Sequence, residues 1–190
     1  MGCWGLAMVE LDYLFHPMGP SSRRSHRVGT GSTFQSFDNL VMHMVETQDR
    51  REANKRVAQQ IYDVWDGGDE DALNELIADD VVFDKPDHLG GQVHGRDAYK
   101  KNLRMVRAGF PDLFFRAQEV VAEDDRVMAY CTFGGTHEGT LMGVEPTGTS
   151  VEVWDFVSYR FDDGKVVEVI SFPDLYGLLL QVGHVEPLGE

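Results

Sequence analysis

The sequence has few cysteines and few lysines, and each scarcity excludes a class of protein. Its two cysteines, Cys3 and Cys131, lie far apart and match no zinc-ligand spacing, so neither a disulfide framework nor a zinc site is predicted. Five lysines and a net charge of −15 argue against nucleic acid and anionic membranes as partners, because both repel an acidic surface. The apolar run Gly2 to Val9 is too short to span a bilayer and lacks preceding basic residues. We therefore predict a cytoplasmic protein.

The acidity is confined to residues 44–190, because residues 1–43 carry equal numbers of basic and acidic side chains. An acidic, lysine-poor surface suits a salt-rich, halophilic cytoplasm, where hydrated carboxylates keep a protein in solution. An acidic protein of an ordinary mesophilic cell is the alternative interpretation.

Motifs for covalent and phosphate chemistry are missing as well. No Gly-x-Ser-x-Gly and no phosphate-binding loop occurs, so nothing indicates a nucleophilic serine or a nucleotide. The run Asp84-Lys85-Pro86-Asp87-His88 contains residue types that bind metals, but no matching ligands occur elsewhere in the sequence. We expect a solvated loop there and predict no metal site.

Length and composition fit one domain with an N-terminal extension, since 42% hydrophobic residues can supply a core. Residues 1–43 show no sustained period and are predicted to be a mobile or poorly structured extension of the domain at 44–190. Met44 directly precedes the first periodic segment, so part of the extension could be a leader translated from an upstream start. A genuine ordered extension is the alternative.

Helical periodicity begins at Asp49, where Asp49 and Glu52 form a plausible capping box. The predicted helix ends at Gly67-Gly68. Its apolar positions are Ala53, Val57, Ile61, Val64 and Trp65. A short helix from Asp69, a strand over 81–83 behind the break at 79–80, and a helix between Gly95 and Gly109 are predicted to follow.

The second half of the chain alternates between apolar and polar residues and predicts four strands. They cover 113–121, 126–136, 150–161 and 165–172, with a tight Asp163-Gly164 hairpin joining the last two. A short apolar helix over 175–182 follows Asp174. Helices followed by a run of strands predict an α+β fold.

Six short motifs follow one another along this region. They are Gly-Phe-Pro-Asp at 109–112, Gly-Thr-His at 135–137, Pro-Thr-Gly at 146–148, Tyr-Arg-Phe at 159–161, Asp-Gly-Lys at 163–165 and Asp-x-x-Gly-Leu-Leu at 174–179. Residues 53–183 therefore resemble the SnoaL-like polyketide cyclase or ester cyclase family of the nuclear-transport-factor-two-like superfamily. The resemblance implies a cone-shaped α+β barrel, in which a curved antiparallel sheet wraps around the first helix and leaves a mostly apolar cavity. It also implies a homodimer.

The chemistry that the resemblance implies is intramolecular aldol ring closure on a small apolar ester or carbonyl substrate, without metal or cofactor. A carboxylate in an apolar cavity suits this reaction, because desolvation raises its pKa toward neutrality. Asp174, before Gly-Leu-Leu, is the first candidate, although it could simply cap the following helix. Asp155 is the second, because it interrupts an apolar strand, although an edge position would explain it too. His137 is either a pocket residue or a hydrogen-bonded turn residue.

The sequence departs from the family where many members carry His-Trp-Asp and this chain has Val169-Ile170-Ser171. A hydroxyl cannot replace that carboxylate as a base, so the proton transfer has moved to another residue or the chemistry differs. Ser171 is kept as a substrate-binding candidate. Further candidates for the pocket wall are Tyr62, Trp65, Phe83, His88, Phe115, Tyr130 and Trp154. Aromatic residues at such positions could equally be ordinary core.

Two other function classes stay open. One is another enzyme of the same fold, such as an isomerase or a dehydratase. The other is a non-catalytic module for small-ligand binding or dimerisation, which the missing His-Trp-Asp favours. An aspartate inside a closed apolar cavity would separate the enzymes from the binder.

Overall fold

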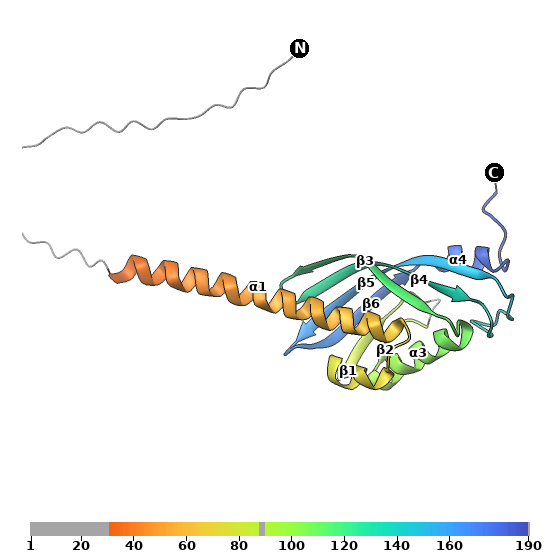
Figure 1. The fold of residues 1–190 in the computed structure, drawn as a ribbon, viewed down its shortest axis with the longest axis horizontal. Helices are drawn as coiled ribbons and strands as arrows, with labels where there is room; N and C mark the ends of the chain where they lie inside the picture. The colour runs from red at the N-terminus through yellow and green to blue at the C-terminus, as the bar shows by residue number, and fades with distance from the viewer. Residues whose placement is uncertain (1–30, 88–89, 190) are drawn as a thin grey trace, which may run out of the picture. The chain divides into compact units, whose positions relative to one another are not determined.

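The computed structural model describes residues 31–87 and 90–189 (Figure 1). The chain divides into two compact units, residues 1–38 and residues 39–190. His88 and Cys3 lie outside the described residues, and the predicted boundary at 43/44 stays a prediction. Among the helices in the described part, none is long and apolar enough to cross a membrane.

The first helix starts earlier than its sequence pattern predicted. α1 spans Gly31–Trp65, so the capping box expected at Asp49 is wrong and both of its residues are interior helix positions. Residues 32–65 contain neither Gly nor Pro, so nothing in the sequence interrupts the helix before Asp66. The helix ends where predicted, with Gly67 at φ 101°.

Short elements connect α1 to the sheet. They are the 3₁₀ turn η1 (Glu70–Ala72), α2 (Leu73–Leu76), β1 (Ile77–Asp84), β2 (Val93–His94) and α3 (Arg96–Gly109). The break expected at Asp79-Asp80 is wrong, because β1 runs through both residues. A register shift against β6 between Ile77 and Val82 accommodates them. The helix at 96–109 is confirmed, and β2 is an additional strand that its two residues were too few to predict.

Four long strands complete one sheet of six, and all four match their predicted ranges to within two residues. They are β3 (Phe114–Glu123), β4 (Arg126–Thr136), β5 (Ser150–Asp162) and β6 (Lys165–Pro173). The strand order is β2-β1-β6-β5-β4-β3, with β1 parallel to β6 and every other pair antiparallel. α4 (Leu175–Gln181) follows β6. The predicted α+β class is confirmed.

The core lies between the sheet and two helices. Figure 1 shows α3 and the second half of α1 on the same side of the sheet. In α1 the buried side chains recur at helical spacing from Ala58 through Ile61 to Trp65, whereas in β5 every second side chain from Val151 to Phe161 is buried. Because of these two periodicities, the buried face of α1 and the inner face of the sheet pack together in one apolar core.

Two motifs of the family resemblance meet at the end of α3. The Asp112 carboxylate accepts hydrogen bonds from the Thr136 backbone N–H at 2.6 Å and from the Thr136 hydroxyl at 2.8 Å. These bonds hold the pKa of Asp112 below its usual range. The Gly-Phe-Pro-Asp turn is thereby tied to the end of β4.

Candidate functional site

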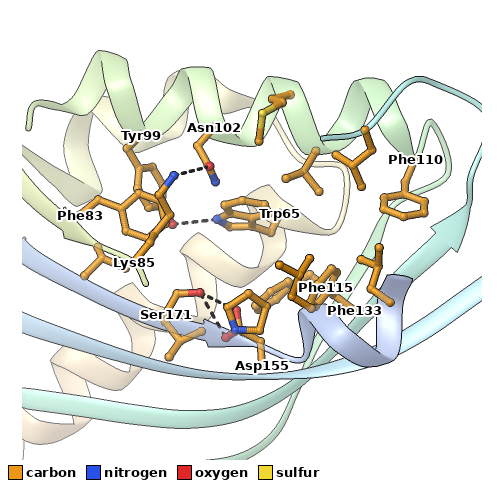
Figure 2. A pocket seen from close by; sticks show the side chains of 18 of the residues that line it. Trp65, Phe83, Lys85, Tyr99, Asn102, Phe110, Phe115, Phe133, Asp155 and Ser171 are labelled. Atoms are coloured by element: carbon orange, nitrogen blue, oxygen red, sulfur yellow. Dashed lines mark hydrogen bonds between the residues drawn. The ribbon is translucent and has the colours of Figure 1, made fainter. Parts of the chain in front are cut away.

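A pocket of about 420 Å³ lies between α3, the end of α1 and the inner face of the sheet (Figure 2). This volume is within the usual range for small-molecule sites. Most of its wall is apolar, and Trp65, Phe83 and Phe115 line it as predicted. Asp155 and Ser171, also predicted for the site, lie in the same wall. The sequence patterns of one helix and four strands therefore converge on one cavity.

Asp155 is the buried acid of this pocket. It belongs to the alternating inner set of β5, between Val153 and Val157, and only 5% of it is exposed. The Ser171 hydroxyl on β6 donates to its Oδ2 at 2.9 Å and to its Oδ1 at 3.2 Å. The edge position that offered another explanation is wrong, because β5 lies between β4 and β6 inside the sheet.

Burial raises the pKa of Asp155 from its usual range to about 7. Hydrogen bonds from the Ser171 hydroxyl and the Phe172 backbone act in the opposite direction but are weaker than the desolvation. A carboxyl group with this pKa is divided between its acid and base forms near neutral pH, so it can both accept and return a proton.

Two tyrosines and a cysteine near Asp155 stay protonated at neutral pH. Burial raises the pKa of the Tyr99 hydroxyl to about 12, and that hydroxyl accepts a hydrogen bond from Trp65 Nε1 at 2.8 Å. Tyr159, which also lines the pocket, has its pKa raised by burial too. Burial raises the pKa of the Cys131 thiol to about 12, which argues against a thiolate nucleophile.

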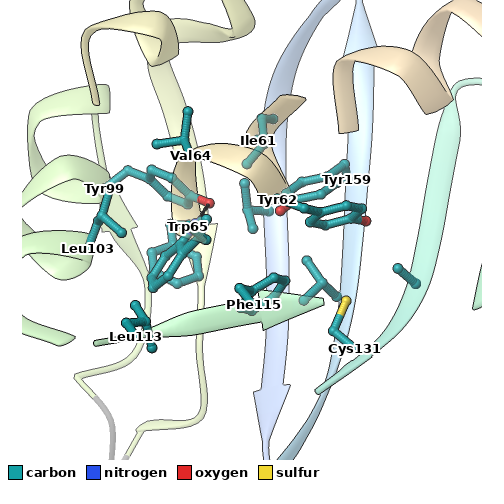
Figure 3. Packing of buried hydrophobic residues seen from close by; sticks show 14 of the residues in the cluster. Ile61, Tyr62, Val64, Trp65, Tyr99, Leu103, Leu113, Phe115, Cys131 and Tyr159 are labelled. Carbon is teal, nitrogen blue, oxygen red and sulfur yellow. Dashed lines mark hydrogen bonds between the residues drawn. The ribbon is translucent and has the colours of Figure 1, made fainter. Parts of the chain in front are cut away.

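Three predicted wall residues do not line this pocket. Tyr62 is 1% exposed and packs in the core beside Phe115 and Tyr159, with ring centroids 5.7 and 5.8 Å away (Figure 3). Trp154 is 42% exposed, on the outer face of β5. Tyr130 packs against Phe156 on that outer face, at 5.4 Å between ring centroids.

Asp174 caps α4. Its carboxylate accepts a hydrogen bond from the Gly177 N–H at 2.8 Å, and a Cβ at Gly177 would lie 2.2 Å from Asp174 Oδ2. Pro173 and Leu175 line the pocket on either side of it in sequence, whereas Asp174 itself is not among the lining residues. The geometry is that of an N-cap, the alternative that the sequence left open.

His137 is buried at the start of the loop after β4. Its Nδ1 lies 3.2 Å from the Thr147 hydroxyl, its backbone N–H donates to Thr149 O at 2.9 Å, and its ring packs against Phe110. It is not among the residues that line the pocket. His137 thus joins the Gly-Thr-His and Pro-Thr-Gly motifs within one loop.

The pocket also contains two polar residues that were not predicted for it, Lys85 and Asn102. Lys85 Nζ donates to Asn102 Oδ1 at 3.2 Å and lies 5.1 Å from the centroid of the Phe83 ring. The available signal was a scarce lysine directly after an apolar strand. Among residues 31–87 and 90–189, no three His, Cys, Asp or Glu side chains gather as metal ligands would.

Comparisons with known proteins cover the elements that build this pocket. The family model described as SnoaL-like polyketide cyclase matches residues 55–182. Nogalonic acid methyl ester cyclase from Streptomyces nogalater is 32% identical over 123 residues, which is 63% of this chain and 90% of the relative.

Two solved structures resemble the fold described above. AclR from Streptomyces galilaeus, a proposed hydroxylase, superposes with a TM-score of 0.65 and 28% identity over 74% of this chain and 87% of its own. IdmH from Streptomyces antibioticus, a proposed polyketide cyclase, superposes with a TM-score of 0.62 and 31% identity over 68% of this chain and 98% of its own.

Proposed function

Because the chain belongs to the SnoaL-like polyketide cyclase family, we propose that it closes a ring within a small polyketide-like ester or ketone by acid–base chemistry. The observation that carries this proposal is the buried Asp155 carboxylate inside a mostly apolar pocket. The name of the Streptomyces nogalater relative, a methyl ester cyclase, supports the choice of an ester substrate.

Asp155 would move the proton in both halves of the reaction. Its carboxylate accepts the proton from a carbon next to a carbonyl, and the resulting enolate carbon attacks a second carbonyl of the same molecule. One carbon–carbon bond forms, and the oxygen of the attacked carbonyl becomes an alkoxide. The alkoxide then takes the proton back from Asp155. A pKa of about 7 suits this exchange, because neither transfer leaves the group in a strongly disfavoured state.

The rest of the pocket would hold the substrate in a folded conformation. Apolar walls from Trp65, Phe83 and Phe115 exclude water and favour a folded chain whose two reacting carbons meet. The reaction is redox-neutral, and the proton that is removed is returned. It therefore needs no oxidant, reductant or group carrier, which is why we propose that it runs without a cofactor.

The outer face of the sheet supports the further proposal of a homodimer. Its exposed apolar side chains come from four adjacent strands, and we call them the outer apolar patch. They are Val121, Met128, Trp154, Phe156 and Phe172. A contiguous apolar surface of this kind is typical of an interface, and a second copy of the same face would cover it.

Composition supports a proposal about the cell compartment. The net charge of −15 and the five lysines favour a salt-rich cytoplasm. Retention of the folded state in molar salt, compared with low salt, tests this point independently of the chemistry.

The test of the proposed function uses a panel of aromatic methyl esters that carry a flexible β-keto side chain. Aldol ring closure conserves mass, so the expected product has the mass of the substrate but a new retention time and absorption spectrum. Asp155→Asn is expected to lower kcat/KM at least about a hundredfold. Asp162→Asn, an exposed carboxylate at the end of the same strand, is the matched control. Equal turnover by Asp155→Asn and the wild type would reject Asp155 as the base.

A further inference from the structure

Lys85 is the lysine that lines the pocket, and its surroundings differ from those of the other lysines. Lys55 pairs with Glu52, Lys100 pairs with Asp71, and Lys165 donates to a backbone carbonyl. Lys101 is exposed on α3. Lys85 instead stands over the Phe83 ring and donates to an amide oxygen.

The charge of Lys85 has no counterion in the described part of the chain. The ion pairs formed within residues 31–87 and 90–189 do not include it. Partial burial lowers the pKa of its ammonium group, as expected of a cation that has lost water without gaining an opposite charge. The cation–π contact with Phe83 holds the ammonium in place but does not neutralise it.

Asn102 is oriented by Lys85. Lysine can only donate, so the amide oxygen of Asn102 must face Nζ, and the amide nitrogen must face away from it. Within the described residues, that nitrogen donates to no protein acceptor. Figure 2 shows the pair between α3 and the strand end that precedes Lys85. The pocket wall therefore holds donors on two neighbouring side chains, the Lys85 ammonium and the Asn102 amide N–H₂, and each has N–H groups left to donate to a ligand.

We propose that Lys85 and Asn102 form a subsite for an anionic oxygen, so that the ligand carries a carboxylate or an ionised enol or phenol in addition to its reacting carbonyl. Two adjacent donors, one of them charged, match an oxygen anion and would gain little from a neutral ester. The subsite would select which ligands enter the pocket. This inference depends on the proposed function only for the identity of the group that reacts.

Binding of naphthoate and of its methyl ester separates charge recognition from apolar packing, because the two probes share one ring system. Titrations at neutral pH are followed by calorimetry. The wild type is expected to prefer the acid, and Lys85→Met is expected to weaken naphthoate binding about tenfold or more while leaving the ester within about twofold. Lys85→Arg should retain most of the preference. Lys101→Met is the matched control on the surface.

Asn102→Asp tests the second donor. The new carboxylate would form an ion pair with Lys85 and neutralise its charge. Naphthoate binding should therefore fall as in Lys85→Met, while the fold and the binding of the ester are retained. Dinitronaphthol, an ionised phenol, distinguishes the source of the oxygen. If Lys85→Met binds dinitronaphthol more weakly than the wild type does, as expected for naphthoate, the subsite accepts any anionic oxygen. If the affinity for dinitronaphthol is unchanged, the subsite is specific for carboxylates.

Two results would overturn the subsite. One is a wild type without preference for naphthoate over its ester. The other is an equal loss of both probes in Lys85→Met, which would indicate packing rather than charge. Asp155→Asn is expected to bind naphthoate at least as tightly as the wild type, because the probe need not react and a partly ionised carboxylate is removed from the same pocket. Failure of the proposed reaction and failure of the subsite therefore give different results.

Discussion

The Ser171 hydroxyl on β6 donates to the Asp155 carboxylate on β5, at 2.9 Å to Oδ2. The family resemblance implied an aspartate at the position of Ser171, whereas the buried carboxylate in the structure belongs to Asp155 on the neighbouring strand. The serine hydroxyl forms a polar contact there but is not a base at neutral pH. Its hydrogen bond favours the ionised form of Asp155 and partly offsets the effect of burial on the pKa.

Ser171→Ala should therefore shift the pH dependence of turnover. With Asp155 as the base, kcat/KM is expected to rise with pH and to level off above about 7. Removal of the hydroxyl raises the pKa of Asp155 further, so the midpoint should move to higher pH. The midpoint is read from kcat/KM measured across pH. Ser158→Ala, half-buried on the same strand as Asp155, should leave it in place. A lower rate at an unchanged midpoint would contradict the assignment.

Asp155→Asn should stabilise the protein at high pH relative to the wild type. The pKa of Asp155 is about 7 when folded and falls to the ordinary aspartate range on unfolding, so the folded state binds the proton more tightly. The wild type thus loses stability as pH rises from about 4 to about 7, by up to about 4 kcal/mol. Urea unfolding of both proteins at pH 4 and pH 8 measures the difference. Asp162→Asn is the control, and a gain that does not depend on pH would exclude the titration of Asp155 as its cause.

Variants of Asp174 should separate a cap from a catalyst. Asp174→Ala removes the acceptor for the Gly177 N–H and should lower the free energy of unfolding by about 1 kcal/mol. Asp174→Asn keeps a capping oxygen and should retain both stability and most of the turnover. Thermal unfolding and kcat are measured together. A folded Asp174→Asn protein without turnover would return Asp174 to the list of proton-transfer candidates.

Gly139→Ala should destabilise the loop that follows β4. A Cβ at this position would lie 1.9 Å from the Ala108 carbonyl oxygen, and the Gly139 N–H donates to the Gly109 carbonyl at 3.1 Å. The loop and the end of α3 would have to separate, at a cost of about 2 kcal/mol or more. Chemical unfolding compares this variant with Gly189→Ala, where an added Cβ meets nothing within 4 Å. Equal stability of the two variants would show that the loop does not pack against α3 as described.

Phe156→Glu should dissociate the proposed homodimer. Phe156 is 51% exposed and contacts Tyr130 and Trp154, so a charge there would be buried without a partner in the outer apolar patch. Light scattering coupled to size exclusion should give a dimer mass for the wild type and a monomer mass for the variant. Leu188→Glu, at an exposed site near the C-terminus, is the control. A monomeric wild type would remove the proposal altogether.

Local patterns predicted most of the fold, because each reports on a short stretch of backbone. The alternation in β3 to β6 and the punctuation by Asp163-Gly164 and Gly109 placed those strands and the end of α3 nearly where they lie. The start of α1 was missed, since a capping box is a preference of a few residues and does not stop a helix that lacks Gly and Pro. The ordered family motifs predicted the α+β barrel of the family, which is confirmed.

The sequence by itself determined the class, most of the elements and the presence of an aspartate within an apolar strand, because periodicity and composition are local. Tertiary structure alone decided that Asp155 faces the cavity while Asp174 caps a helix, since the sequence left a structural role open for each of the two aspartates. It also decided that Ser171, 16 residues away, reaches Asp155, and that Lys85 and Asn102 meet. Such pairings depend on strand register and helix docking, which bring distant residues within hydrogen-bond range and set the desolvation that shifts a pKa.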